Sequence, residues 1–263
     1  MASHRNRPGL PLPRAVDELI LTTILLFAVV TMVRWLRDPH SPLYVSGLRA
    51  ALLVVAVASG LLVVALILSP PGRRSGGHMN PAVTVALWLM DVFPGRSVLP
   101  YAAAQMAGSV IGVALARLVW GPVTSTPSIG YAAIRPGPHW DASSVFLAEA
   151  GCFVALTLVI GFFLAHPVFG RWLPYLLGLS IALIIVCLGT QSGGSVNPAR
   201  HFGPALFAGD TNQFWIYVFA PVLGAVLGAS VHHLLMRRLH THQPLTYKLC
   251  GTPQRSERQD ESA

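Results

Sequence analysis

Six long apolar runs, separated by short polar segments, divide this chain of 263 residues. A helix needs about 20 apolar residues to cross the hydrocarbon core of a membrane. The pattern therefore predicts six membrane-spanning helices. We expect them at residues 15–35, 48–68, 98–119, 145–165, 172–188 and 214–235.

Two further apolar segments, residues 81–90 and 198–207, are too short to cross a membrane. Each starts within an Asn-Pro-Ala motif, whose Asn is Asn80 in the first copy and Asn197 in the second. Asn is a preferred residue just before a helix, and Pro fits the first helical position because its missing N–H needs no partner there. The sequence therefore predicts a half-helix after each Asn.

The two Asn-Pro-Ala motifs lie 117 residues apart and indicate a duplicated unit. Each unit holds three spans and one half-helix, the first at about residues 15–120 and the second at about 142–236. Since three is an odd number of crossings, the second copy must be inverted in the membrane. We predict an all-α membrane protein with six transmembrane helices, two half-helices and an inverted 3+3 repeat.

The segments outside these units are polar. Residues 1–14 are rich in Pro and Arg and are expected to form a disordered basic arm, and residues 237–263 a polar tail. Residues 121–141, rich in Pro, Gly, Ser and Thr, read as the linker between the repeats. Residues 69–74 are expected to form a turn. The predicted membrane domain is thus residues 15–236.

The composition agrees with a membrane protein, because 53% of residues are hydrophobic and only 11% are charged, against about 25% charged in soluble domains. The net charge of +8 is spread over the termini and the loops between apolar runs, which argues against a nucleic-acid partner. The three cysteines have no metal-ligand spacing or disulfide framework, and we expect Cys152 and Cys187 to be small apolar core residues. Nothing in the chain indicates a bound cofactor, metal or nucleotide, so transport should be passive.

The loop charges predict the orientation of the chain. Basic residues at both termini and in three loops fall on one side of the membrane, which should be the cytoplasm. The other side carries basic and acidic residues with a lower positive excess. Both termini of this multi-pass cell-membrane protein are therefore expected inside. The first group includes Arg73, Arg74, Arg96 and Arg171, and the second Arg37, Asp38, Arg135, Asp141 and Asp210.

The half-helices indicate a pore. Irregular backbone inside a membrane is tolerated only where it is buried in protein or lines a watery cavity. In an inverted repeat, the positive N-terminal ends of two half-helices meet near the midplane, an arrangement used to build transport sites.

The motifs around the half-helices resemble those of the aquaporin and glycerol-facilitator family, also called the major intrinsic proteins. The similar stretch runs from about Glu18 to Val231. The resemblance implies a right-handed bundle, usually a homotetramer in membrane lipid with one pore per subunit. The residues that carry it are Ser75–Thr84, Tyr101 through Gln105 to Gly108, Glu149, and Gly194–Pro204.

The resemblance also assigns roles at the pore centre. The side-chain amides of Asn80 and Asn197 would hold a passing solute oxygen, and a water molecule held by both turns its hydrogens outward, which interrupts proton transfer. The facing helix dipoles add a barrier to cations. The rest of the two motifs is Pro81, Ala82, Pro198 and Ala199.

Four positions would form the selectivity filter: Ser59 or its neighbour Gly60, with Ile185, Gly194 and Arg200. This filter is wider and less polar than a strict water filter, which favours passage of glycerol, urea or other small neutral solutes, with water following.

Other positions point to a water channel. Glycerol facilitators normally carry Asp where this chain has His201, and Ala205 and Tyr217 are typical of water channels. A strict water channel therefore stays open as the alternative.

Four further residues are expected to support the site. Glu18 and Glu149 should brace the half-helix loops by accepting backbone N–H bonds, with proton transfer as the alternative. His78 should order its loop or narrow the inner vestibule, with a pH gate as the alternative. His201 should be a neutral side chain behind the filter, although protonation beside Arg200 could alter passage.

Two rival classes are less consistent with the sequence. An intramembrane serine protease would need Ser59 and a histidine such as His232, but no histidine lies at a matched depth, so we predict no enzyme activity. A poorly conducting junction protein of the same fold is disfavoured by the intact Asn80, Asn197 and Arg200.

Overall fold

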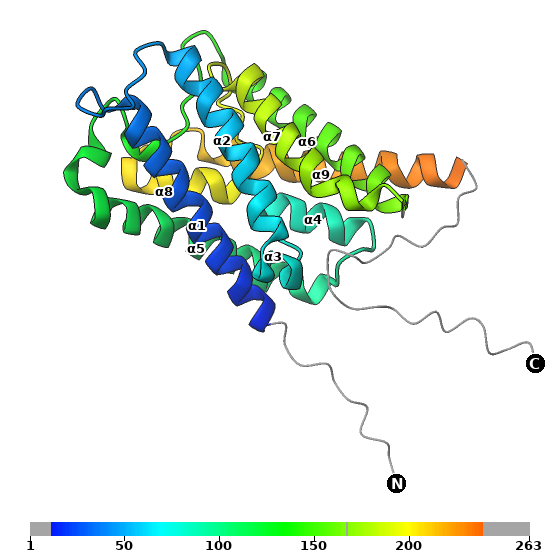
Figure 1. Cartoon of the computed structure of the whole chain (residues 1–263). Helices are drawn as coiled ribbons and strands as arrows, with labels where there is room; N and C mark the ends of the chain where they lie inside the picture. Colours follow the sequence, from blue (N-terminus) through cyan, green and yellow to red (C-terminus); the bar gives the residue numbers. More distant parts are fainter. Residues whose placement is uncertain (1–11, 167, 239–263) are drawn as a thin grey trace, which may run out of the picture.

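The computed structural model describes residues 12–166 and 168–238, and over these ranges it contains helices and no strands (Figure 1). Six helices are long and apolar enough to cross a membrane. This confirms the predicted all-α membrane fold. The six are α1 (Leu12–Arg37), α2 (Leu48–Leu68), α5 (Val98–Trp120), α6 (Ala142–Ala165), α7 (Leu173–Leu188) and α9 (Phe214–Arg238).

The two expected half-helices are α4 (Pro81–Leu89) and α8 (Pro198–Ala208). The Asn before each one has an extended backbone, and its side-chain oxygen accepts a hydrogen bond from the first turn. Each half-helix has Pro in its first position. The local sequence thus determines where both half-helices begin, as expected for an Asn cap.

The helix contacts repeat in both halves of the chain. In the first half α1 packs along α5, and in the second half α6 packs along α9. Helices α2 and α7 pair across the two halves, which Figure 1 shows at the front of the bundle. Each half-helix contacts a span of the opposite repeat, α4 with α9 and α8 with α5. The repeats are therefore interlocked, with each one holding the half-helix of the other.

Glycines allow the closest helix contacts. A Cβ atom added to Gly112 of α5 would lie 2.5 Å from the carbonyl oxygen of Thr23 on α1. A Cβ on Gly60 of α2 would lie 2.6 Å from the carbonyl oxygen of Gly178 on α7. These helices approach backbone to backbone, as small residues permit in membrane proteins.

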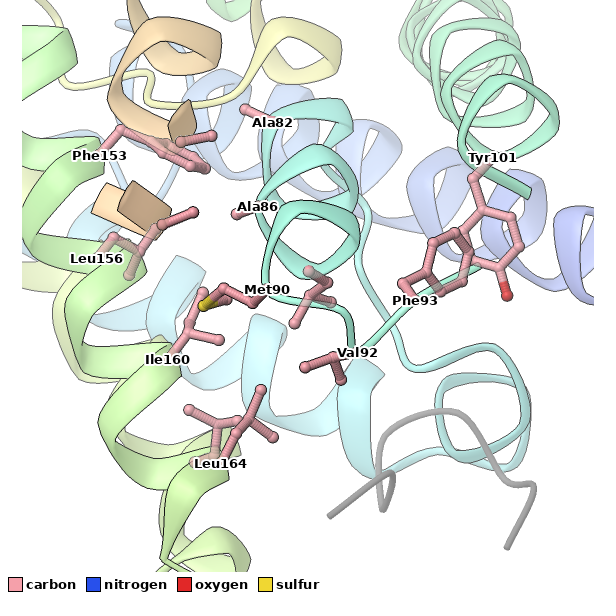
Figure 2. Close-up of a cluster of buried hydrophobic side chains, with 14 of the residues drawn as sticks. Ala82, Ala86, Met90, Val92, Phe93, Tyr101, Phe153, Leu156, Ile160 and Leu164 are labelled. Carbon is pink, nitrogen blue, oxygen red and sulfur yellow. The ribbon is translucent and has the colours of Figure 1, made fainter. Parts of the chain in front are cut away.

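The core around α4 is apolar (Figure 2). Ala82 and Ala86 of α4, and Met90 just after it, face the α6 side chains Phe153 and Leu156, and all five are buried. The half-helix is therefore held along its length by side-chain packing as well as at its start by its cap.

Several boundaries differ from the expected ones. Helix α1 begins at Leu12, inside the range expected for the arm, and α9 continues to Arg238, while residues 1–11 and 239–263 lie outside the described residues. In place of the expected turn at residues 69–74, the structure has a short helix, α3 (Pro70–Ser75). Ser69 caps this helix, and Pro occupies its first turn. Within the linker, Gly121–Ser125 and Gly130–Ala132 form 3₁₀ turns.

The expectation that both span cysteines are core residues was wrong for one of them. Cys152 is half-buried, but Cys187 is exposed on α7. An apolar run in a membrane helix has a lipid-facing side, so the hydrophobicity of a run does not distinguish the two sides.

The start of α6 is fixed by Asp141, whose carboxylate accepts a bond of 2.9 Å from the backbone N–H of Ser144. Hydrogen bonds from Ser144, and then from Ser143, lower the pKa of Asp141 to about 2. This cap therefore remains charged over the physiological pH range.

The close contact at Gly112 makes a testable prediction. Changing Gly112 to Val should lower the stability by about 1–3 kcal/mol, because the new side chain overlaps the α1 backbone. Thermal unfolding of the purified protein in detergent measures this. The control is Gly151→Ala on α6, where a Cβ has no neighbour within 4 Å. Equal unfolding midpoints for the two variants would contradict the role of Gly112.

Candidate functional site

The two Asn-Pro-Ala loops are joined at the centre of the molecule by a reciprocal pair of hydrogen bonds. The side-chain nitrogen of Asn80 donates to the carbonyl of Val196 at 2.9 Å, and that of Asn197 donates to the carbonyl of Met79 at 2.8 Å. Each Asn oxygen caps its own half-helix, by accepting from Ala82 and from Ala199 at 2.9 Å. An amide nitrogen has two N–H groups, so one on each Asn remains for another acceptor.

This reciprocal bonding depends on unusual backbone conformations. Met79 and Val196 precede the two Asn residues and have positive φ angles, 48° and 43°. Such angles are costly for side-chain-bearing residues, at roughly 1–3 kcal/mol each, and persist only where the surroundings enforce them. Here they direct the two carbonyls at the opposite Asn residues.

Glu18 provides that enforcement in the first repeat. This α1 side chain is fully buried. One carboxylate oxygen accepts from the backbone N–H of His78 at 2.9 Å and the hydroxyl of Ser75 at 2.7 Å. The other accepts from the N–H of Met79 and the side-chain amide of Gln105, both at 2.7 Å. Glu18 therefore lies within the loop network.

Glu149 of α6 has the same arrangement in the second repeat. It accepts from the hydroxyl of Ser192 at 2.8 Å, from the N–H of Ser195 at 3.1 Å and from the N–H of Val196 at 2.6 Å. A buried tyrosine completes each copy. Tyr101 donates to the carbonyl of Ser75 at 2.9 Å, and Tyr217 to that of Ser192 at 2.6 Å.

His78 lies within the first loop network. Its Nδ1 is 3.0 Å from the hydroxyl of Thr84 on α4, and its ring contacts Phe93 and Tyr101 at centroid distances of 4.9 and 5.2 Å. The side chain is buried, and its Nε2 has no hydrogen-bond partner. It also lines the inner cavity described below, so it both orders the loop and forms part of the wall.

Two cavities meet at the joined loops. We call the one that His78 lines the inner cavity and the one that Arg200 lines the outer cavity, following the predicted orientation, and their volumes are about 60 and 430 Å³. Four residues line both cavities, and only one of them is polar. The two cavities are therefore neighbours that share part of their wall, including Asn197. The shared residues are Leu25, Val63, Ile181 and Asn197.

All four expected filter residues, Ser59, Ile185, Gly194 and Arg200, line the outer cavity. Gly60, the alternative to Ser59, packs against α7 instead. Ser59 is therefore the residue of this pair that lines the cavity. Gly194 has a φ of +58°, which a side chain would strain. Nη1 of Arg200 is buried without a hydrogen-bond partner.

His201 lies beside this wall and lines neither cavity. The ring stacks on Tyr217 at a centroid distance of 4.0 Å and on Phe214 at 5.8 Å. It is only 2% exposed, and neither ring nitrogen has a hydrogen-bond partner. The environment is that of a buried aromatic packing residue.

Ser59 and His232, the pair considered for a protease, do not share a site. His232 packs against Gly161 of α6 and lines neither cavity, whereas Ser59 faces the outer one.

An ion pair connects the loop region to the start of α1. Arg74 of α3 bonds both carboxylate oxygens of Asp17, at 2.6 and 3.0 Å. The hydrogen bond with Asp17 holds the pKa of Arg74 above its ordinary value. Asp17 and Glu18 thus anchor the two ends of one short segment, residues 74–79.

Sequence reasoning missed several wall residues. Leu25, Val63 and Ile181 lie in unremarkable apolar runs, and no local signal separates a pore-facing from a lipid-facing side chain there. For the linker, the sequence indicated no individual wall residue, and the structure shows that Ile134 and Arg135 line the outer cavity.

The fold and the paired loops are those of a membrane channel. A model of the family described as Major intrinsic protein matches residues 11–232. The chain therefore belongs to the major intrinsic protein family, which is a family of membrane channels.

Individual relatives agree with this family. Aquaporin AqpM of Methanothermobacter marburgensis is 35% identical over 239 residues, covering 84% of this chain and 96% of that protein. The glycerol uptake facilitator protein of Escherichia coli is 30% identical over 259 residues, covering 86% and 88%. The aquaglyceroporin of Plasmodium falciparum shares the fold, with a TM-score of 0.74, 21% identity, and coverage of 86% and 97%.

The network around Glu149 makes a second prediction. Glu149→Gln replaces an acceptor with an N–H₂ group that faces other donors, so it should lower stability by about 1–3 kcal/mol and reduce water flux. Thermal unfolding and stopped-flow light scattering of proteoliposomes measure the two effects. Thr157→Val on the same helix is the control, because the Thr157 hydroxyl is buried without a partner. A variant with wild-type stability and flux would show that the loop does not need the charge.

Proposed function

We propose that this protein is a passive channel for water and small neutral solutes such as glycerol. The observation that carries the proposal is the reciprocal bonding of Asn80 and Asn197, which leaves one N–H of each amide for a solute in the path. A hydroxyl or water oxygen at the centre would accept from both. A water molecule held in this way cannot relay a proton along a water chain.

The electrostatics of the centre favour neutral solutes. The N-terminal ends of α4 and α8 meet there, and their dipoles oppose cations. Among the described residues, none that lines either cavity is acidic, whereas Arg37, Arg135 and Arg200 line the outer one. Cations would therefore meet a positive outer mouth and a positive centre.

The outer filter favours a solute larger than water. Ser59 and Gly194 are small, and Ile185 is apolar, so Arg200 is the one charged donor among the four positions. A polyol would place hydroxyl groups at Arg200 and its C–H edge at Ile185. The relatives named for water and for glycerol are consistent with passage of either.

The inner cavity is smaller than the outer one. Its volume of about 60 Å³ holds only a few water molecules, and its walls include the apolar side chains of Leu156, Ile160 and Leu177. Solutes crossing this half lose most of their hydrogen bonds to water, which favours small molecules with few hydroxyl groups.

The membrane arrangement forms part of the proposal. Six spans place the start of α1 and the end of α9 on the same side, and the basic loops assign that side to the cytoplasm. Arg49 and Arg117 lie near the outer ends of α2 and α5 and were not included in the loop charges counted from the sequence. They reduce the excess of positive charge on the cytoplasmic side relative to the outer side. We further propose a homotetramer in membrane lipid, by resemblance to the family.

A strict water channel is the second candidate, favoured by Tyr217 and His201 behind the filter. A poorly conducting junction protein is opposed by the intact centre. An enzyme is opposed by the absence of a paired nucleophile and base in the two cavities. Flux measurements discriminate among these.

The channel proposal predicts rapid glycerol-driven reswelling of proteoliposomes as well as fast water flux. Stopped-flow light scattering under a water gradient and then a glycerol gradient measures both. Water flux without glycerol flux would establish the strict water channel. Flux of neither would favour the junction class.

The filter proposal predicts the effect of one substitution. Ile185→His should reduce glycerol permeability about tenfold relative to water, because it narrows the wall and adds a polar ring. The same reswelling assay gives the ratio. Ile184→Val serves as a control in the adjacent position, since Ile184 does not line the outer cavity. An unchanged ratio for Ile185→His would remove Ile185 from the filter.

A further inference from the structure

We propose that Ile134, on the linker between the repeats, is a fifth wall residue of the outer mouth and limits the size of the solutes that enter. This inference rests on the proposed channel function and deepens it. It assigns a specificity role to a segment that carries none of the family motifs noted in the sequence.

The position of Ile134 supports this role. It lines the same outer cavity as Ser59, Ile185, Gly194 and Arg200. The linker supplies a substantial part of that wall, including Pro127–Gly130, Ala132–Arg135, Gly137 and Pro138. The outer mouth is therefore built from the spans, the second loop and the linker together.

Ile134 occupies space that the second loop leaves empty. Its Cγ2 methyl fills the place where a Cβ on Gly193 would lie. Gly193 has a φ of +90°, which also disfavours a side chain there. The loop thus provides backbone at this point, and the linker provides the side chain, directly beside the filter position Gly194.

The linker is held in this position by contacts on either side of Ile134. The N–H of Gly137 donates to the carbonyl of Gln191 at 2.6 Å, which ties the linker to the second loop. Arg135 pairs with Asp210, just beyond α8, at 3.0 Å. Before Ile134, the ring of Tyr131 lies 5.6 Å from that of Phe207 on α8.

Ile134 itself also packs against the buried cluster that contains Val145, Ile216 and Tyr217. Because Tyr217 donates to Ser192 in the second loop, the linker side chain and the filter loop share one support. A wall residue fixed in this way sets the width of the mouth.

The chemistry of the mouth follows from these positions. Ile134 and Ile185 contribute two apolar surfaces, and Arg200 contributes hydrogen-bond donors. The solute class that fits has hydroxyl groups on one side and C–H groups on the other, as short linear polyols do. Longer polyols should be excluded by the bulk of Ile134.

The test compares Ile134→Ala and Ile134→Phe in proteoliposomes, with water, glycerol, erythritol and xylitol as probes. Ile134→Ala should raise the permeability to the two longer polyols by about three- to tenfold and leave that of water unchanged. Ile134→Phe should lower glycerol permeability by a similar factor while water still passes. Val123→Ala is the matched control, since Val123 lies in the linker but outside the cavity.

The outcomes separate this inference from the proposed function. A wild-type protein that conducts neither water nor glycerol overturns both. A conducting wild type whose solute ratios are the same in Ile134→Ala, Ile134→Phe and Val123→Ala overturns the role of Ile134 alone. Thermal unfolding midpoints near the wild-type value establish that changed ratios come from the mouth and not from loss of fold.

Discussion

Two buried carboxylates determine how irregular backbone is held inside this membrane protein. An unpaired N–H in a lipid environment costs several kcal/mol, so a loop at membrane depth needs internal acceptors. Glu18 accepts the N–H groups of His78 and Met79, and Glu149 those of Ser195 and Val196. The positive φ angles at Met79 and Val196, and hence the reciprocal bonds of the two Asn side chains, depend on these acceptors. The two loops can therefore line the cavities at the centre of the molecule without leaving these N–H groups unpaired.

The duplicated loops are chemically alike, but the two ends of the path are not. Both repeats use a Glu, a Ser and a Tyr around the loop, and the first adds Gln105, His78 and Thr84. On the inner side, apolar side chains from five helices surround a small cavity. On the outer side, the cavity is several times larger, and its wall holds two more arginines, Arg135 from the linker and Arg37 from α1. The two cavities therefore differ in both size and chemistry, although the loops between them are alike.

The two histidines near the loops illustrate how similar residues acquire different roles. His78 bonds Thr84 and lines the inner cavity, so a change in its charge would be felt along the path. His201 stacks on Tyr217 and contacts neither cavity, which is the environment of an aromatic support. Both are adjacent in sequence to motif residues, and only their neighbours in space distinguish them.

The sequence by itself determined the number of spans, the half-helices and the inverted repeat, because these depend on segment length, on the Asn and Pro caps and on an odd number of crossings. It also pointed to Glu18, Glu149 and the two Asn residues, which form the loop networks, and to Ser59, Ile185, Gly194 and Arg200, which line one cavity. All of these lie in or at fixed distances from recognisable motifs. Only the tertiary structure decided which side of an apolar helix faces the path, as for Leu25, Val63 and Ile181, and that Cys187 faces outward. It alone placed Ile134 beside Gly193, because the linker has no periodic pattern and its position follows from contacts with residues distant in the sequence.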